Sequence, residues 1–207
     1  MSADPNAPAP VFVVEDDDAM RDAIEALLQM CGHDVRCYAS GAAFRAAIDA
    51  ARTGCIVMDV RMPEIDGLAF QRHMTEAGIA LPIIFISGYA DVALSVKAMR
   101  QGAFTFLTKP FRDQDLLDAV ADALQVERAT RAHRLEGIDA RAAFAALTPR
   151  ERQIMTDMTH GAPNKLIAAR LGLSEAMVKV IRAGIMRKMN ATSLPHLTRL
   201  AERHDLG

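Results

Sequence analysis

The sequence predicts an α/β domain built on a doubly wound, five-stranded parallel sheet, followed by a long linker helix and an all-α domain of four helices. In the first half of the chain, short apolar runs alternate with segments that carry apolar residues at helical spacing, a pattern typical of parallel sheets covered on both faces. In the second half, helix-capping residues open the segments and glycines close them.

The predicted strands are short and almost wholly apolar, as expected for strands that are buried on both faces of a sheet. Three of the helices between them stop before or at Gly32, Gly78 and Gly102. We expect strands at residues 11–14, 34–38, 55–59, 81–88 and 103–107, and helices at residues 18–31, 41–51, 65–78, 91–101 and from 113 onward.

Polar side chains follow four of these strands. Glu15 and Asp16 come directly after the first strand, Asp59 ends the third, Ser87 ends the fourth, and Lys109 follows the fifth. Because parallel strands have their carboxyl ends at one edge, where such sheets bind ligands, we expect these residues to form one site. Clustered carboxylates suit a hard cation such as Mg²⁺ or Mn²⁺. Asp59 can then act as a nucleophile toward a phosphorylated donor, with Lys109 and Ser87 contacting phosphoryl oxygens.

The motifs V-V-E-D-D-D, D-V-R-M-P-E-I-D-G, F-I-S-G and L-T-K-P-F resemble the receiver domain of two-component response regulators, which has a flavodoxin-like fold. The resemblance implies that Asp59 is the phosphoacceptor. It also implies that Asp16 is a direct metal ligand, that Glu15 is a ligand through water, and that the Arg61 backbone carbonyl is a further ligand. Glu15 departs from the family's usual Asp by one methylene group.

The same resemblance assigns a switch to the far strands of the sheet. It implies that Ser87 and Lys109 sense the phosphoryl group and that the Lys109–Pro110 bond is cis. Phe106 falls at the family's aromatic switch position, whose ring turns inward as the serine hydroxyl closes on the phosphate.

A long helix is predicted to follow, because residues 113–136 contain neither Gly nor Pro. Its apolar spacing fades after Val126, which favours a helical linker beyond the first domain. A dimeric coiled coil is the alternative, although Leu117 and Leu124 are not continued at position 131, which is Arg.

The second half predicts a helix-turn-helix. A capping box, residues 148–151, opens a helix that runs to about His160. We expect Asn164 to cap a short helix, Gly172 to make a tight turn, and Ser174 to cap the next helix, which ends near residue 189. Residues 194–204 supply a fourth helix. A plain helical bundle is the alternative.

The motifs L-T-P-R-E-R-Q-I, G-x-P-N-K-x-I-A-x-x-L and S-x-x-x-V-K-V resemble the LuxR-type DNA-binding domain. The whole chain is therefore similar to the FixJ/NarL family of response regulators, and residues 193–197 look most like its FixJ branch. Met177 and Ile181 stand where Thr and His are usual, which removes candidate phosphate contacts. The DNA-contacting residues that the resemblance implies are Lys179, Val180, Arg182, Ala183, Arg187 and Lys188.

These patterns divide the chain into four parts. We expect a disordered tail at residues 1–9, a receiver domain at 10–126, a helical linker at 127–144 and a DNA-binding domain at 145–207.

The distribution of charge supports two modules with different partners. Residues 1–140 hold 13 basic and 21 acidic residues, whereas residues 141–207 hold 11 and 5. An acidic half that binds a cation and a basic half that binds nucleic acid fit this asymmetry.

The remaining sequence features predict a soluble, cytoplasmic protein with no membrane partner. No signal peptide is evident, and no apolar run approaches the length needed to cross a bilayer. Cys31, Cys37 and Cys55 lack zinc spacing, so reduced thiols are expected, with redox sensing by the first two as an alternative.

Together these features predict a transcription regulator activated by phosphorylation. A partner histidine kinase phosphorylates Asp59, and the chain then forms a homodimer on double-stranded DNA, with RNA polymerase as a further candidate partner. One alternative is a protein-interaction switch with weak or absent DNA binding, motivated by Met177 and Ile181. Another is a phosphatase or hydrolase, but no second acid–base group is evident beside the carboxylates. We therefore expect no enzyme beyond phosphotransfer and slow autodephosphorylation.

Overall fold

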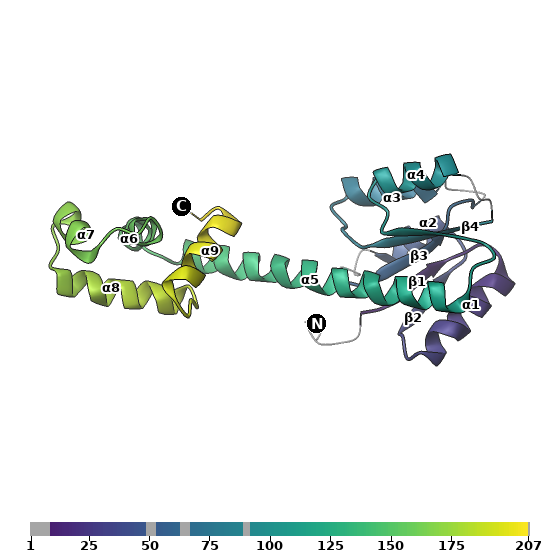
Figure 1. Ribbon diagram of the computed structural model, residues 1–207, viewed down its shortest axis with the longest axis horizontal. Helices are drawn as coiled ribbons and strands as arrows, with labels where there is room; N and C mark the ends of the chain where they lie inside the picture. The colour runs from purple at the N-terminus through teal and green to yellow at the C-terminus, as the bar shows by residue number, and fades with distance from the viewer. Residues whose placement is uncertain (1–8, 49–52, 63–66, 89–91, 207) are drawn as a thin grey trace. The chain divides into compact units, whose positions relative to one another are not determined.

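The computed structural model describes residues 9–48, 53–62, 67–88 and 92–206. The chain divides into two compact units, with the boundary between Arg131 and Ala132. The first unit is a parallel sheet covered by helices, and the second is helical (Figure 1). This arrangement confirms the predicted fold class.

The sheet is five-stranded and fully parallel, with the strand order β2-β1-β3-β4-β5. This order makes β3 the central strand, so its carboxyl end lies in the middle of one sheet edge. The strands are β1 (Val11–Val14), β2 (Val35–Tyr38), β3 (Cys55–Asp59), β4 (Ile83–Ser87) and β5 (Thr105–Thr108).

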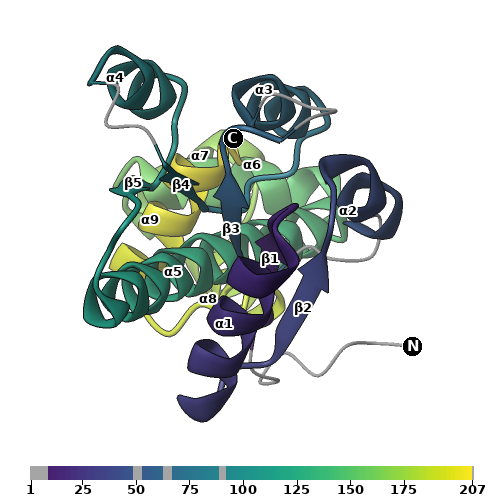
Figure 2. The same cartoon turned by 90° about the vertical axis from the view of Figure 1, so that its right-hand side faces the viewer.

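Helices cover both faces of the sheet, as Figure 2 shows. Side chains alternate across each strand, so Phe12 and Ile56 enter one core with α2, α3 and α4, while Val13 and Val57 enter the other with α1 and α5. The helices of this unit are α1 (Asp18–Met30), α2 (Gly41–Ala47), α3 (Gly67–Glu76), α4 (Val92–Arg100) and the first part of α5 (Asp113–Ala145).

Several predicted boundaries shift by a few residues. The fifth strand is predicted at 103–107 but spans Thr105–Thr108, because its pairing with β4 begins opposite Ile84. Parts of the predicted tail and of the helices at 41–51, 65–78 and 91–101 lie outside the described residues.

The long helix extends past the stretch without Gly or Pro, residues 113–136, and ends close to the predicted end of the linker. α5 continues through Gly137 to Ala145. A Cβ atom at Gly137 would lie 2.9 Å from His204 Nδ1, so the missing side chain lets the histidine ring of α9 pack directly on the linker backbone. A glycine that weakens an isolated helix is therefore used for close packing.

The second unit contains the predicted helix-turn-helix. After α5 the chain forms α6 (Pro149–Thr159), α7 (Asn164–Leu171), α8 (Glu175–Lys188) and α9 (Leu194–His204). The predicted capping box is present at Thr148 and Glu151, and the Ser174 side chain accepts a hydrogen bond from Met177 N. Gly172 takes the left-handed conformation, with φ 63°, between α7 and α8.

One capping prediction is wrong. The N-cap of α7 is Pro163, which makes no side-chain capping bond, and Asn164 is the first helical residue. Pro163 is extended, with φ −71° and ψ 152°, so the helix begins at the next residue and Asn164 lies inside it.

We predict that Gly54→Ala destabilises the first unit much more than Gly78→Ala. Gly54 has φ +124°, and a Cβ there would overlap the Pro10 carbonyl oxygen, which accepts a hydrogen bond from Cys55 N at the start of β3. The cost should exceed about 3 kcal/mol.

Gly78 is the matched control, because it also has a positive φ, +69°, but no atom lies within 4 Å of the position that a Cβ would take there. Its cost should be about 1–2 kcal/mol. Urea denaturation of the two variants measures the difference, and equal costs would contradict a role for close packing at Gly54.

Candidate functional site

The candidate site lies at the carboxyl edge of the sheet. In the parallel register Val14 lies beside Met58, Asp59 beside Ile86, and Ser87 beside Thr108, so these strands end at similar heights. The polar residues that follow β1, β3 and β5 are thereby brought together.

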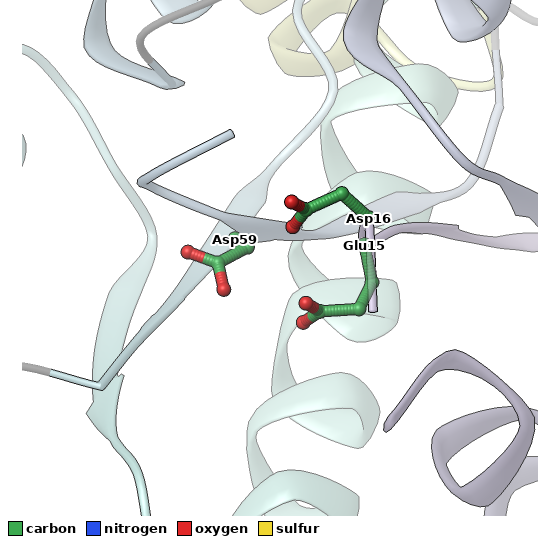
Figure 3. A group of neighbouring side chains, drawn as sticks. All are labelled: Glu15, Asp16 and Asp59. Carbon is green, nitrogen blue, oxygen red and sulfur yellow. The ribbon is translucent and has the colours of Figure 1, made fainter. Parts of the chain in front are cut away.

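Three carboxylates form a cluster at this edge (Figure 3). One oxygen from each of Glu15, Asp16 and Asp59 can be chosen so that all three lie within 4.8 Å of one another. Glu15 is 1% exposed and Asp59 is 7% exposed, whereas Asp16 is exposed to solvent. In Figure 3 the Glu15 and Asp16 side chains leave adjacent residues and extend toward the side occupied by Asp59. A donor set made entirely of carboxylate oxygens fits a hard divalent cation.

Lys109 joins two of these carboxylates. Its Nζ donates hydrogen bonds to Glu15 Oε2 at 2.8 Å and to Asp59 Oδ2 at 2.7 Å. The Lys109–Pro110 bond is cis, as expected. Glu15 and Asp59 are both acidic and both buried, so they repel each other and lose hydration. The positive charge of the Lys109 ammonium group compensates for both effects.

The titration of the buried groups reflects this balance. Burial raises the pKa of Glu15, and its bond to Lys109 offsets only part of that effect. Burial opposes the charged form of Lys109, but hydrogen bonds to Asp59 and Glu15 outweigh it, so the pKa of Lys109 is raised. Lys109 therefore stays charged at neutral pH.

Backbone and side-chain contacts orient the acidic groups. The Arg61 backbone N–H donates to Asp59 Oδ1 at 2.8 Å, which leaves the other oxygen, Oδ2, to Lys109. Arg21 Nη1 donates to the Glu15 carbonyl oxygen at 2.9 Å and also pairs with Asp18. Sequence reasoning missed Arg21, whose one signal is its position in the first turns of the helix that follows the acidic run.

The four adjacent carboxylates of residues 15–18 have three different tasks. Glu15 and Asp16 belong to the cluster, while Asp17 accepts a hydrogen bond from Met20 N and caps α1. Asp18 pairs with Arg21 on the surface. The repulsion between neighbouring carboxylates is reduced because their side chains have different partners.

The predicted switch residues lie on neighbouring strands. Ser87 is fully buried at the end of β4. Phe106 lies on β5 opposite Phe85 and packs, partly buried, against the core on the α3 and α4 side. Ser87 therefore lies at the carboxyl end of its strand, whereas Phe106 lies within β5, and a switch that involves the two residues stays a prediction.

The second helix of the helix-turn-helix exposes most of the predicted DNA-contacting residues. Lys179, Val180, Ala183 and Arg187 are exposed on α8, and Arg182 is half-buried. Lys188 differs, because its Nζ donates to both Glu151 carboxylate oxygens, at 2.8 and 2.9 Å. That pairing lowers the pKa of Glu151 and occupies Lys188 within the unit.

The two departures from the LuxR pattern have different surroundings. Met177 is 49% exposed on α8. Ile181 is partly buried and packs against the core of the second unit, together with Val178 and Ile185 of the same helix. An apolar residue at position 181 therefore adds core packing.

The environments of two cysteines bear on the predicted state of the thiols. Burial raises the pKa of both Cys37 and Cys55 to about 12, so few of these thiols are thiolates at neutral pH. That disfavours redox sensing by Cys37.

Within the described ranges, no helix is long and apolar enough to cross a membrane.

Family models match both units of the chain. Residues 11–121 match the response regulator receiver domain, and residues 145–201 match the bacterial regulatory proteins of the luxR family. The chain therefore belongs to the two-component response regulators, in the FixJ/NarL family that joins a receiver to a LuxR-type helix-turn-helix domain.

Individual relatives are similar to nearly the whole chain. The response regulator protein TmoT of Ectopseudomonas mendocina is 40% identical over 193 residues, which span 93% of this chain and 88% of that protein. The transcriptional regulatory protein FixJ of Azorhizobium caulinodans is 42% identical over 196 residues, spanning 93% of this chain and 91% of that protein. The solved structure of response regulator StyR has a TM-score of 0.83 at 38% identity, covering 95% of this chain and 100% of that chain.

We predict that Glu15→Gln changes how stability depends on pH. Because the pKa of Glu15 is raised above 4.5, the folded state holds this proton more tightly than the unfolded chain does. The carboxyl group therefore contributes stability at low pH, and that contribution is lost as the pH rises through the raised pKa.

The amide in Glu15→Gln has no such titration. Relative to the wild type, the variant should gain free energy of unfolding as the pH rises from about 4 to about 7. Urea denaturation without divalent cations measures this difference, and a difference that falls with pH would contradict the burial of an ionised carboxylate.

Proposed function

We propose that the chain is a phosphorylation-activated transcription regulator that acts in the cytoplasm. The observation that carries the proposal is the position of Asp59, which lies beside two acidic side chains and one lysine in a chain whose other unit is LuxR-type. The family consists of transcription regulators rather than enzymes, and we propose no activity beyond phosphotransfer and slow autodephosphorylation.

We propose that the carboxylate cluster holds Mg²⁺ or Mn²⁺. The exposed Asp16 and the edge residue Asp59 are suited to direct ligation, with the Arg61 backbone carbonyl as a further ligand. Glu15 is buried and already bonded to Lys109, which favours ligation through water. When bound, the cation supplies positive charge that offsets the repulsion between the carboxylates and an incoming phosphoryl group.

In the proposed transfer, an Asp59 carboxylate oxygen attacks phosphorus. A new P–O bond forms while the P–N bond to the kinase's phosphohistidine breaks, and its electron pair stays on the imidazole nitrogen. The Arg61 N–H orients Asp59, and Lys109 is placed to neutralise charge on a phosphoryl oxygen. The product carries about −1.5 to −2 additional charge at this edge.

We propose that this charge shifts the first unit between two conformations. The phosphoryl group provides new acceptor oxygens for Lys109 and for the Ser87 hydroxyl, and the Phe106 ring turns inward as Ser87 moves. The surface formed by α4, β5 and α5 then changes, which favours a homodimer. Two DNA-binding units can thereby engage paired half-sites on double-stranded DNA.

The exposed residues of α8 are the proposed DNA-contacting surface. Lys179 and Arg187 supply phosphate or base contacts, and Val180 and Ala183 are small enough for the helix to approach base edges in the major groove. The core packing of Ile181 weakens the case for a pure protein-interaction switch, because that substitution has a structural use that leaves the exposed face intact.

We predict that Asp16→Asn raises the Mg²⁺ concentration needed for half-maximal phosphorylation by acetyl phosphate at least tenfold, because one carboxylate ligand is lost. Asp59→Asn should accept no phosphoryl group at this site. Mass spectrometry of the intact protein measures both effects.

Asp18→Asn is the matched control for Asp16→Asn. Asp18 belongs to the same acidic run but pairs with Arg21 on the surface. Its Mg²⁺ requirement should equal that of the wild type. An Asp16→Asn variant with an unchanged requirement would contradict the proposed ligand set.

We predict that Lys179→Ala and Lys188→Ala separate DNA contact from packing. Lys179 is exposed on α8, so its loss should weaken DNA binding and reduce the slope of log affinity against log salt concentration by about 1. Lys188 is engaged by Glu151, so its loss should leave that slope unchanged and cost less than about 1 kcal/mol of stability.

Salt titrations of phosphorylated protein on a bound promoter fragment, together with thermal unfolding, measure both quantities. A reduced slope for Lys188→Ala would show that DNA displaces Glu151 and would contradict the separation.

A further inference from the structure

The second unit leaves an apolar stripe on the outer face of the linker helix. Leu135 is 43% exposed and Ile138 is 55% exposed, whereas Phe144, the other large apolar residue of this stretch, packs against the core of the second unit. On the opposite face of the same helix, Gly137 contacts His204 and Ala140 enters the core. At 3.6 residues per turn, the two exposed side chains point away from that packed face. Large apolar side chains that adjoin on a surface indicate an interaction site.

The stripe has the spacing of a coiled-coil seam. Leu135 and Ile138 are followed at intervals of four and three by Ala142 and Ala145, both exposed. Leu117 and Leu124 fall at the same heptad position as Ile138, three and two heptads earlier, but Leu124 is buried in the core of the first unit and Leu117 packs against it. Arg131 occupies the next equivalent position, so an apolar seam can begin only after that residue.

Charges beside the stripe identify the partner. Arg134 precedes the seam on one side, and Asp139 follows Ile138 on the other. In a parallel pair of identical helices, side chains five residues apart at these flanking positions meet across the interface. Arg134 of each copy then faces Asp139 of the other, and the two-fold axis repeats the pair. The face is therefore complementary to itself.

We propose that residues 134–145 of the linker helix form a short parallel coiled coil with the same segment of a second copy of this chain. The seam covers less than two heptads, which is too short to hold two chains together alone. It closes once phosphorylated receivers or adjacent DNA half-sites raise the local concentration. The inference rests on the proposed function for that first contact, and it assigns the linker a part in the active dimer.

Cysteine cross-linking of the full-length protein tests the contact directly. In a Cys31→Ser background, which removes the exposed native thiol, Ile138→Cys places a thiol in the seam. Ala132→Cys is the matched control, because it is exposed on the same helix roughly a quarter-turn away from the seam. With acetyl phosphate and Mg²⁺, the Ile138→Cys variant should form disulfide-linked dimers at least tenfold faster than the Ala132→Cys variant.

Charge reversal tests the orientation of the helices. Arg134→Asp or Asp139→Arg alone places like charges opposite each other, and each should raise the dimer dissociation constant of the phosphorylated protein about fivefold. The double variant restores opposite charges and should return to within about twofold of the wild type. Analytical ultracentrifugation measures the constants, and thermal unfolding of the unphosphorylated variants confirms that each remains folded.

The outcomes separate this inference from the proposed function. Equal cross-linking at positions 138 and 132, or a double variant that is not restored, would overturn the seam even where phosphorylation still drives DNA retention. Slow maleimide labelling of the Ile138→Cys variant in the unphosphorylated monomer would assign the face to another part of the same chain, and would also overturn it. Loss of phosphorylation-dependent DNA retention in the wild type would instead overturn the proposed function.

Discussion

The candidate site depends on one interaction, the ammonium group of Lys109 held between the carboxylates of Glu15 and Asp59. Two acidic groups buried side by side repel each other and lose hydration, so the sheet edge needs a cation within hydrogen-bonding distance. Lys109 lies far from Glu15 and Asp59 in the sequence, directly after β5. The order of the strands and the electrostatics of the site are therefore linked, because the charge is balanced only when the ends of β1, β3 and β5 lie together.

Much of this edge could be predicted from the sequence because parallel strands impose a simple rule. A polar residue that follows a buried apolar run lies at the carboxyl edge, whichever loops come between. That rule places Glu15, Asp59 and Lys109 correctly without knowledge of any contact. Arg21 could not be predicted in this way, because it lies inside a helix and contacts the Glu15 backbone carbonyl. A pattern of side-chain types does not indicate such a contact.

The second unit shows where residue patterns stop being informative. The capping box and the Gly172 turn are local features, and both are present where expected. The pairing of Lys188 with Glu151 joins residues 37 positions apart, and the packing of Ile181 depends on the neighbouring helices. The sequence alone does not show whether a basic residue on a DNA-binding helix contacts DNA or pairs within the protein. Nor does it show whether an apolar substitution in that helix lies on the surface or packs in the core. Only the three-dimensional arrangement distinguishes the two uses.

The division of labour within residues 15–18 also bears on how this chain tolerates change. Four neighbouring acidic residues look interchangeable, yet each is under a different chemical constraint. Position 17 needs only a short side-chain oxygen to cap α1, so Asn, Ser or Thr would serve there. Position 18 sits on the surface, where an ion pair contributes little. If the cluster holds a cation as proposed, positions 15 and 16 need a carboxylate oxygen at a fixed reach, so substitutions compatible with function should fall on the second half of the run and spare the first.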